Sequence, residues 1–202
     1  MNFEDRSDDK MKLHYKGKFD GNIDNLPKGE LEKHENAVKF KEMDDMKKFM
    51  IIMNVVAGIM MIILGAVFIW RAGGFSEFSY VGMLIAILSL FPHELLHAIC
   101  FKEDVDMYLA DGGAFVCGTE TMSKFRFIFM SLLPNIILGF IPFIVFLIFP
   151  NQTIFGTLGV IAISMGVGDY YNVFNALTQM PKGARCFMKK KFLLVYAIRV
   201  NE

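Results

Sequence analysis

"LFPHELLHAICF", residues Leu90–Phe101, places two histidines and a glutamate inside a run of apolar residues. An ionisable side chain at the centre of a bilayer-spanning helix costs roughly 2.5–3.5 kcal/mol, so such residues are rarely present there without a function. His93 and His97 are four positions apart and share one face of a helix, from which both imidazoles can reach a single ion. Pro92 is expected to break or restart the helix directly before His93. The stretch therefore predicts a metal site inside a hydrophobic helix.

Four apolar segments dominate this chain of 202 residues, and each is long enough to cross a bilayer core, which takes about 20 residues. They are residues 49–70, 81–101, 127–149 and 154–177. Hydrophobic residues make up 54% of the chain, which is more than a soluble domain of this size usually has. The sequence therefore predicts an all-α polytopic membrane protein with four transmembrane helices.

The charged residues outside these segments predict the orientation. Of the 21 Lys and Arg residues, 20 lie in residues 1–48, 102–126 and 178–202, and Arg71 is the exception. Basic residues favour the cytoplasmic side of a membrane. We therefore expect a multi-pass protein of the cell membrane with both termini in the cytoplasm. Residues 1–48 would be a polar N-terminal tail, residues 49–177 the membrane domain and residues 178–202 a C-terminal tail.

The cytoplasmic parts carry weaker patterns. His14 and His34 are interpreted as surface residues of a solvated N-terminal tail, although residues 30–48 also fit an amphipathic helix that leads into the membrane. Between the second and third segments, apolar residues alternate on either side of an Asp-Gly-Gly turn at residues 111–113. This pattern predicts a small cytosolic β-hairpin, whose edge offers an extended peptide a place to bind by β-addition.

A third metal ligand must come from another segment, because a catalytic zinc ion usually has three protein ligands and one open position. Asp169 is the one other acidic residue within the four apolar segments. At about 1.5 Å of rise per residue, His93 and Asp169 each lie ~12 Å from the cytosolic end of their own segment. Asp104 and Asp106 in the loop remain alternatives, although they lie nearer the cytosol than the histidines.

An asparagine lies at the same predicted depth, since Asn135 is eight residues from the cytosolic end of the third segment. We expect it to bind substrate, with its amide donating to a substrate carbonyl or to the oxyanion of a tetrahedral intermediate. The alternative is a hydrogen bond between helices beside a kink at Pro134. Asn172 and Asn175 fit the same two interpretations.

The His-Glu-x-x-His pattern predicts a metallohydrolase with one zinc ion per chain. Zinc suits neutral imidazole ligands, and Glu94, next to the first histidine, can take a proton from a zinc-bound water as general base. A structural zinc site would not need Glu94, and a transporter would not need this histidine spacing. A non-catalytic zinc-binding membrane scaffold and a metal or proton transporter remain alternatives. No nucleic-acid partner is expected.

Three short motifs relate these residues to a known family, namely "HELLH" in the second segment, "LLPN" in the third and "GDYYN" in the fourth. With them the chain, from about Phe49 to its C-terminal tail, resembles membrane-embedded zinc metalloproteases of the site-2 protease type, including small bacterial four-helix proteins described as zincin peptidases. The resemblance implies zinc bound by His93, His97 and Asp169. It also implies Glu94 as general base and, as substrate, a membrane protein or membrane peptide cleaved in or near its span. Typical site-2 proteases place the third ligand in an Asn-Pro-x-Asp-Gly sequence, whereas Asp169 lies in Gly-Asp-Tyr.

Overall fold

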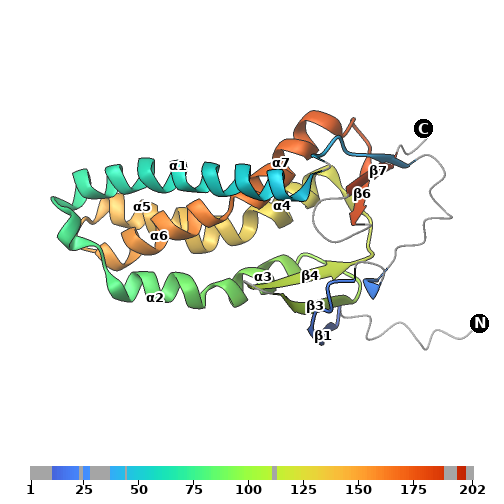
Figure 1. The fold of residues 1–202 in the computed structure, drawn as a ribbon, viewed down its shortest axis with the longest axis horizontal. Coiled ribbons are helices and arrows are strands. Elements are labelled where there is room, and N and C mark those ends of the chain that lie inside the picture. The colour runs from blue at the N-terminus through green and yellow to red at the C-terminus, as the bar shows by residue number, and fades with distance from the viewer. Residues whose placement is uncertain are drawn as a thin grey trace, which may run out of the picture.

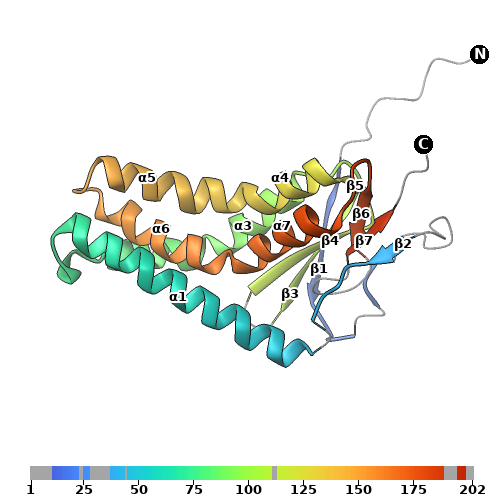
Figure 2. The ribbon, with the colours of Figure 1, turned by 90° about the horizontal axis from the view of Figure 1, so that it is seen from above.

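The structure, a computed structural model, describes residues 11–22, 25–27, 37–43, 45–110, 113–188 and 195–198. Its α-helices are α1 (Met46–Ala72), α2 (Tyr80–Leu88), α3 (Leu90–Ala98), α4 (Lys124–Asn135), α5 (Ile141–Ile148), α6 (Thr153–Met165) and α7 (Val167–Gln179). A 3-10 turn, η3 (Phe75–Glu77), follows α1, and a π-helix, η4 (Ile136–Phe140), joins α4 to α5. The strands gather toward one end of the molecule (Figure 1). Seen from above, α6 and α7 lie between α1 on one side and α4 and α5 on the other (Figure 2).

The helices contain two to four candidate membrane spans. Two continuous helices, Lys47–Ala72 and Lys124–Ile148, are long and apolar enough to cross a bilayer. The pairs α2–α3 and α6–α7 qualify if each bent pair counts as one span, and their bends are 40° and 51°. The mostly helical fold predicted from the sequence is confirmed, and the second and fourth apolar segments are broken helices.

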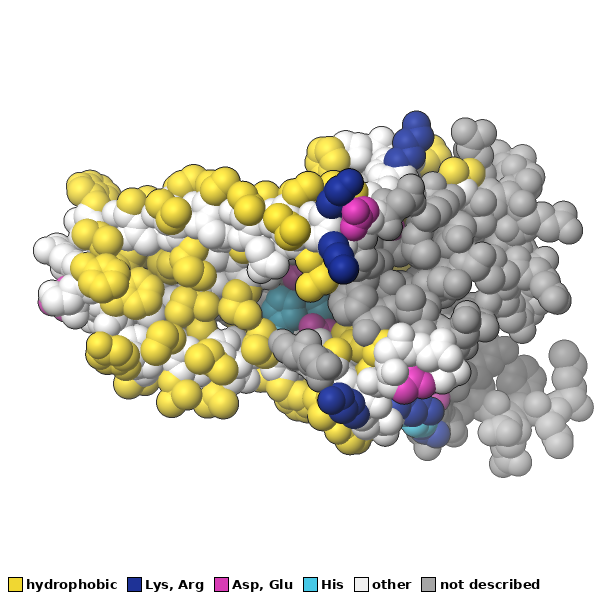
Figure 3. Space-filling view, viewed as in Figure 1, with side chains coloured by type: hydrophobic (Ala, Val, Ile, Leu, Met, Phe, Trp, Pro, Cys, Tyr) yellow, Lys and Arg dark blue, Asp and Glu magenta, His cyan; other side chains and the backbone are white. Residues whose placement is uncertain are grey.

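Helix α1 exposes most of its apolar side chains. Asp45 begins the helix by accepting hydrogen bonds from the N–H groups of Lys47 and Lys48, and Gly73 ends it in the left-handed conformation, at a φ of 90°. On the face shown in Figure 3, hydrophobic side chains cover the helices, and charged side chains gather where the helices meet the strands. Such a surface is consistent with a membrane protein.

The break between α2 and α3 has its cause in Pro92. Proline has no N–H, so Pro92 cannot bond to the carbonyl of Leu88, the last residue of α2. Pro92 is tolerated in the first turn of α3, because the first N–H groups of a helix have no partner within it. The sequence predicts a break directly before His93, whereas the chain bends at Ser89, since the hydrogen bond that Pro92 removes lies one turn earlier.

Glycines allow the central helices to approach closely. A Cβ atom at Gly159 of α6 would lie 2.8 Å from the backbone nitrogen of Phe143 in α5, and one at Gly156 would lie 2.6 Å from the ring of Phe146. Phe68 of α1 stacks on Phe146, with ring centroids 4.8 Å apart. Small residues at helix interfaces permit such packing in membrane proteins. It holds α6, and with it the start of α7, against the neighbouring helices.

Two small sheets lie at the other end of the molecule. One has the order β1 (Leu13–Lys18), β3 (Val105–Ala110), β4 (Gly113–Gly118), and the other has the order β2 (Ala37–Lys39), β7 (Val195–Ile198), β6 (Arg185–Met188), β5 (Met122–Ser123). The antiparallel β3–β4 pair confirms the predicted hairpin, although residues 111 and 112 of its turn lie outside the described residues. Because β1 pairs with β3 in parallel, β4 is an edge strand within the described part of the chain.

The segments expected to be solvated tails contribute strands to both sheets. Strands β1 and β2 precede α1, and β6 and β7 follow α7. The carboxylate of Asp104, just before β3, lies 2.9 Å from Nε2 of His14 in β1, and both side chains are exposed. Residues 37–43 contain a strand and no helix, in contrast to the amphipathic helix that also fitted residues 30–48. His34 lies outside the described residues.

An apolar core joins the helices to the sheets. Its members come from α3, α4, α7 and several strands, and include Ala98, Phe101, Val105, Met107, Val116, Phe127, Met130 and Ala176. Val116 belongs to β4 and Ala98 to α3, so this core packs the edge strand against the helix that carries both histidines.

Candidate metal centre

Three side chains from the two bent helix pairs meet at one point. On α3, Nε2 of His93 and Nε2 of His97 are 3.2 Å apart. Asp169, in the first turn of α7, places Oδ2 at 3.2 Å from Nε2 of His93 and Oδ1 at 3.3 Å from Nε2 of His97. The three ligand atoms lie within 4.8 Å of one another. The structure thus brings together the three residues that the sequence predicts as zinc ligands.

The separations between these atoms fit a tetrahedral metal ion. Bonds of about 2.0–2.1 Å at tetrahedral angles place neighbouring ligand atoms about 3.3 Å apart. The two imidazole nitrogens are 3.2 Å apart, and each lies 3.2 to 3.3 Å from a different oxygen of the Asp169 carboxylate. Two imidazoles and a carboxylate are also a donor set that zinc accepts, and they leave the fourth position open. The residues present therefore fit a catalytic type of zinc site.

His97 is held in the tautomer that a metal ligand needs. Its Nδ1 lies 2.9 Å from the backbone carbonyl of Met130, which can only accept, so Nδ1 carries the hydrogen. In a neutral imidazole Nε2 then presents a lone pair, and this lone pair faces the carboxylate of Asp169 at 3.3 Å. Two electron-rich groups at this distance repel each other unless a proton or a cation lies between them. A metal ion removes this conflict.

The carbonyl of Met130 is available to His97 because of Pro134. In a regular helix the N–H of residue 134 would bond to the carbonyl of residue 130, but proline has no N–H and its ring pushes that carbonyl aside. Two residues later the helix widens into the π-helix Ile136–Phe140. The "LLPN" motif therefore supplies a backbone acceptor for His97, one of the candidate metal ligands.

Asn135 contacts the carboxylate of Asp169. Its Nδ2 donates to Oδ2 of Asp169 at 2.7 Å and to the carbonyl of Ser131 at 3.2 Å. The hydroxyl of Tyr170 lies 3.3 Å from Oδ1 of Asn135 and 3.1 Å from the carbonyl of Ile163, so these two acceptors share its one hydrogen. Asn135 is 1% exposed, and both hydrogens of its amide are engaged in these bonds. This arrangement corresponds to the hydrogen bond between helices that the sequence left open, and the substrate contact expected of Asn135 stays a prediction.

Asn135 and α7 approach so closely because residue 166 is a glycine. A Cβ atom at Gly166 would lie 1.8 Å from Oδ1 of Asn135. Gly166 is also the residue at which α6 ends and α7 begins. Asp169 follows in the first turn of α7, where unpaired N–H groups favour a negative side chain. The glycine therefore makes room for the amide, and the break positions the carboxylate that the amide holds.

A cavity of about 310 Å³ adjoins the three residues. Its polar lining includes Glu94, Ser131 and Asn172, and aromatic and apolar side chains form most of the rest. The carboxylate of Glu94 takes a hydrogen bond from the backbone N–H of Val116, so the edge of β4 faces the cavity. Histidine and carboxylate atoms are visible from outside in a recess between the helices (Figure 3). The site is therefore open to a ligand from this side.

Other candidate ligands lie elsewhere or stay protonated. Asp104 pairs with His14, and a carboxylate oxygen of Asp106 lies 3.6 Å from Nζ of Lys16. Cys117 lines the cavity, but burial raises the pKa of its thiol to about 11, and the nearby Asp106 adds to this. Because the thiolate is the form that binds metal, Cys117 is a poor ligand at neutral pH.

The part of the chain that carries the site matches a protein family. Residues 86–185 match the model of a family described as "putative zincin peptidase". The matched region runs from α2 to the start of β6 and includes both histidines and Asp169. The match supports a zinc peptidase family, with the zinc binding that this implies. The chain matches no curated protein and no solved structure.

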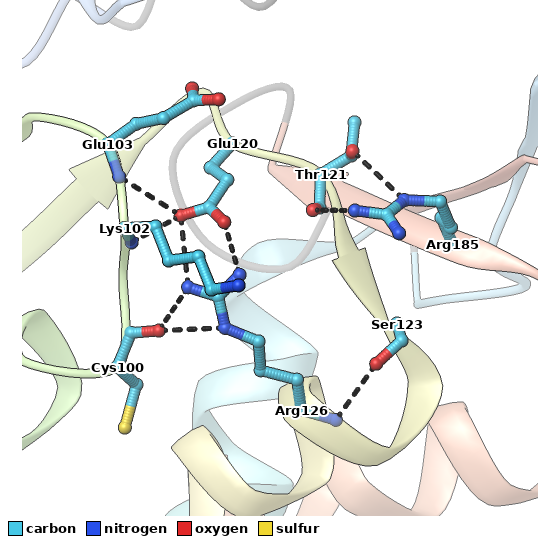
Figure 4. A network of polar contacts seen from close by, with 8 residues as sticks. All are labelled: Cys100, Lys102, Glu103, Glu120, Thr121, Ser123, Arg126 and Arg185. Atoms are coloured by element: carbon cyan, nitrogen blue, oxygen red, sulfur yellow. Dashed lines mark hydrogen bonds and ion pairs between the residues drawn. The ribbon is translucent and has the colours of Figure 1, made fainter. Parts of the chain in front are cut away.

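Within the zincin-matched region, a partly buried ion pair anchors the end of α3 (Figure 4). Arg126 of α4 pairs with Glu120 and donates from Nε to the carbonyl of Cys100 at 3.0 Å. Glu120 also accepts from the N–H groups of Lys102 at 2.6 Å and Glu103 at 3.3 Å. Burial raises the pKa of Glu120, but the bonds from Arg126 and the two N–H groups outweigh it and hold the pKa below its ordinary value of 4.5. The residues that follow the His-Glu-x-x-His helix are thereby tied to α4.

The sequence does not reveal several groups around the convergent residues. The carbonyl of Met130 has no side-chain signal, and the role of Pro134 in exposing it requires the neighbouring helix to be known. Ser131 carries a signal that could have been used, because it lies four residues before Asn135 and therefore on the same helix face. Tyr170, next to Asp169, reads as an interfacial aromatic residue until its bond to Asn135 is seen.

Proposed function

We propose that this chain is a membrane-embedded zinc peptidase of the site-2 protease type, which hydrolyses peptide bonds in or near the membrane spans of other proteins. It would cross the cell membrane four times, with both termini and the two sheets on the cytoplasmic side. The bias of 20 of 21 basic residues toward that side supports this orientation. The two broken helices would count as spans because their irregular backbone is buried in protein or lines a cavity.

The observation that carries the proposal is the convergence of His93, His97 and Asp169 beside a cavity that Glu94 also lines. Glu94 is outside the three-ligand group but adjoins it on α3. A scaffold that only retains zinc has no use for a fourth ionisable side chain in this cavity. The zincin match favours a peptidase over a transporter.

In the proposed mechanism, His93, His97 and Asp169 hold one zinc ion, which when bound supplies Lewis acidity toward the scissile carbonyl and the attacking water. The carbonyl of Met130 and the amide of Asn135 keep two of these ligands in place. Glu94 accepts a proton from the attacking water and then passes it to the leaving amine. The apolar walls of the cavity keep bulk water away from these transfers.

We propose further that substrate binds along the edge of β4. The N–H of Val116 faces Glu94 and not β3, and strand alternation gives Ala114 the same outward direction. A membrane helix must unwind to expose its scissile carbonyl, and an extended segment can then pair with this edge. Ala114→Pro removes one outward donor without removing a bond of the β3–β4 ladder. Slower cleavage supports this binding mode, and unchanged turnover contradicts it.

The test compares zinc content and cleavage in protein reconstituted into lipid vesicles. Glu94→Gln should retain one zinc ion per chain but lose cleavage of a synthetic transmembrane peptide, because the proton acceptor is gone. His93→Ala and His97→Ala should lose both zinc and cleavage. Glu77→Gln, an exposed acid in the turn after α1, is the matched control and should behave as wild type.

Three outcomes would contradict the peptidase. Zinc bound to His93→Ala and His97→Ala protein at the wild-type level would show that the three residues do not form the site. Flux of zinc or protons across the vesicle membrane that depends on these residues, without cleavage, would indicate the transporter. Loss of zinc in the His93→Ala and His97→Ala variants, together with no measurable effect of Glu94→Gln, would indicate the non-catalytic scaffold.

A further inference from the structure

Ser131 presents a buried hydroxyl that has no partner. Its side chain is 1% exposed and lines the cavity beside the three convergent residues. Within the described part of the chain, its Oγ makes no hydrogen bond. An unpaired hydroxyl away from water costs free energy, and native structures rarely retain one without a ligand or bound water nearby. Ser131 therefore points to a group that enters the cavity.

Asn172 presents a second unengaged group to the same cavity. It lies three residues after Asp169 on α7, and so on the same side of that helix. Its side chain lines the cavity and makes no hydrogen bond with the residues that the structure describes. A carboxamide can donate and accept at once, as each unit of a peptide backbone requires.

The other asparagines near the site are unsuited to this role. Asn135 spends both amide hydrogens on Asp169 and Ser131, and its Oδ1 on Tyr170. The Nδ2 of Asn175 is also unpaired, but Asn175 does not line the cavity. Asn172 and Ser131, in contrast, both line the cavity and both have side-chain polar atoms that make no hydrogen bond within the described part of the chain.

A substrate strand bound along the edge of β4 would have backbone groups on its other side that require hydrogen-bond partners. Backbone N–H and C=O groups of an extended segment point alternately to its two sides. Those on one side pair with β4, and those on the other side face the wall formed by α4 and α7, which carry Ser131 and Asn172. Backbone groups buried against that wall without partners would oppose binding.

We propose that Ser131 and Asn172 bind the backbone of the substrate, pairing with the groups of an extended apolar segment that face away from β4. This inference rests on the proposed peptidase function and assigns the substrate contact to Asn172 and Ser131 in place of Asn135. The two residues hold substrate and take no part in binding zinc. Their loss therefore weakens substrate binding and leaves the metal site intact.

The experiment measures the Kd of a fluorescent transmembrane peptide for zinc-loaded Glu94→Gln protein, which binds without cleaving. Adding Ser131→Ala or Asn172→Ala should each raise Kd about 2–10-fold, as expected for one neutral hydrogen bond. Ser164→Ala and Asn54→Ala are matched controls, because both side chains bond to their own helix outside the cavity, and they should leave Kd unchanged. In the cleaving enzyme, Asn172→Ala should raise KM more than it lowers kcat, and Asn172→Gln should restore part of the loss.

Zinc content and Tm distinguish substrate binding from a structural role. Because the side chains of Ser131 and Asn172 make no hydrogen bond within the described part of the chain, both alanine variants should keep zinc and a wild-type or higher Tm. A lower Tm together with lost zinc would overturn the inference, as would unchanged Kd and KM in both variants of an enzyme that cleaves. Absence of cleavage by wild-type protein would instead overturn the peptidase proposal.

Discussion

Replacing Pro134 by alanine should weaken zinc binding while making helix α4 more regular. The substitution restores an N–H at position 134, and this N–H can bond to the carbonyl of Met130 in the ordinary helical way. The same carbonyl accepts from Nδ1 of His97 at 2.9 Å. We expect the new donor to compete with His97, which then loses the contact that fixes its tautomer and ring orientation.

Two opposing free energies determine the size of the effect on the metal-free fold. Proline in a helix interior is about 3 kcal/mol less favourable than alanine. The ring of Pro134 is fully buried, and losing its two extra methylenes removes about 1.6 kcal/mol of apolar burial. The unfolding free energy of the zinc-free variant should therefore equal the wild-type value or exceed it by about 1 kcal/mol. Loss of a group that orients a metal ligand typically lowers affinity by about 10–100-fold, or roughly 1.4–2.7 kcal/mol.

The assay pairs a zinc competition titration against a coloured chelator with unfolding followed by far-UV circular dichroism in the same detergent. Pro142→Ala is the matched control, because Pro142 is also buried but lies in the first turn of α5, where no site residue uses a carbonyl it frees. Zinc affinity should fall in Pro134→Ala and not in Pro142→Ala. Wild-type affinity in Pro134→Ala would refute the role given to the proline, as would an equal loss in both variants.

Three further predictions concern the surroundings of the site. Arg126→Met should destabilise the fold by about 3 kcal/mol, since it leaves the buried carboxylate of Glu120 without its partner. Adding Glu120→Gln should recover at least ~1 kcal/mol of this loss. If the unfolding free energies of the two single variants added to that of the double variant within about 0.5 kcal/mol, the pairing would be contradicted. The pKa of Glu120 in the folded protein lies below its ordinary value of 4.5, so the charged carboxylate stabilises the fold above that pH. This contribution is lost as the pH falls through the folded pKa. The unfolding midpoint of Glu120→Gln should therefore drop less than that of wild type between about pH 6 and about pH 3. Gly166→Ala should displace Asn135 and weaken zinc binding about 10-fold in the competition titration, whereas Gly58→Ala, whose Cβ meets open space, should not.

The helices and the convergent residues could be predicted from the sequence because their signals are local. Apolar runs of bilayer length identify helices, and an i, i+4 spacing places His93 and His97 on one face whatever surrounds them. The prediction of Asp169 has a different basis, since an acid in an apolar segment needs a partner at its own depth. The structure brings its carboxylate within 3.3 Å of both imidazoles.

The sheets as a whole could not be predicted in the same way, because several of their strands pair across long distances in sequence. Strand β1 pairs with β3, with Leu13 opposite Val105, and β2 pairs with β7, with Ala37 opposite Ile198. Strands β1 and β2, with the sequences LHYKGK and AVK, are short and carry lysines, so each is interpreted as solvated chain when considered alone. The hairpin β3–β4 has its partner nearby, and it is the part of the sheets that the sequence predicts. Strands β6 and β7 also pair close together in sequence, but both lie in the segment predicted to be a C-terminal tail.

Interrupted helices have a common role in this fold, because each segment that carries a site residue is interrupted close to that residue. Pro92 breaks the helix before the histidines. Pro134, the residue before Asn135, frees the carbonyl of Met130. Gly166 separates α6 from the first turn of α7, which holds Asp169. In an apolar solvent, free backbone groups are tolerated only where protein satisfies them or a cavity receives them. The carbonyl of Met130 meets the first condition through its bond to His97. The edge of β4 meets the second, since it faces the cavity in which we propose that substrate completes its hydrogen bonds. The same interruptions that make these segments poor uniform spans therefore supply the polar backbone from which the site is built.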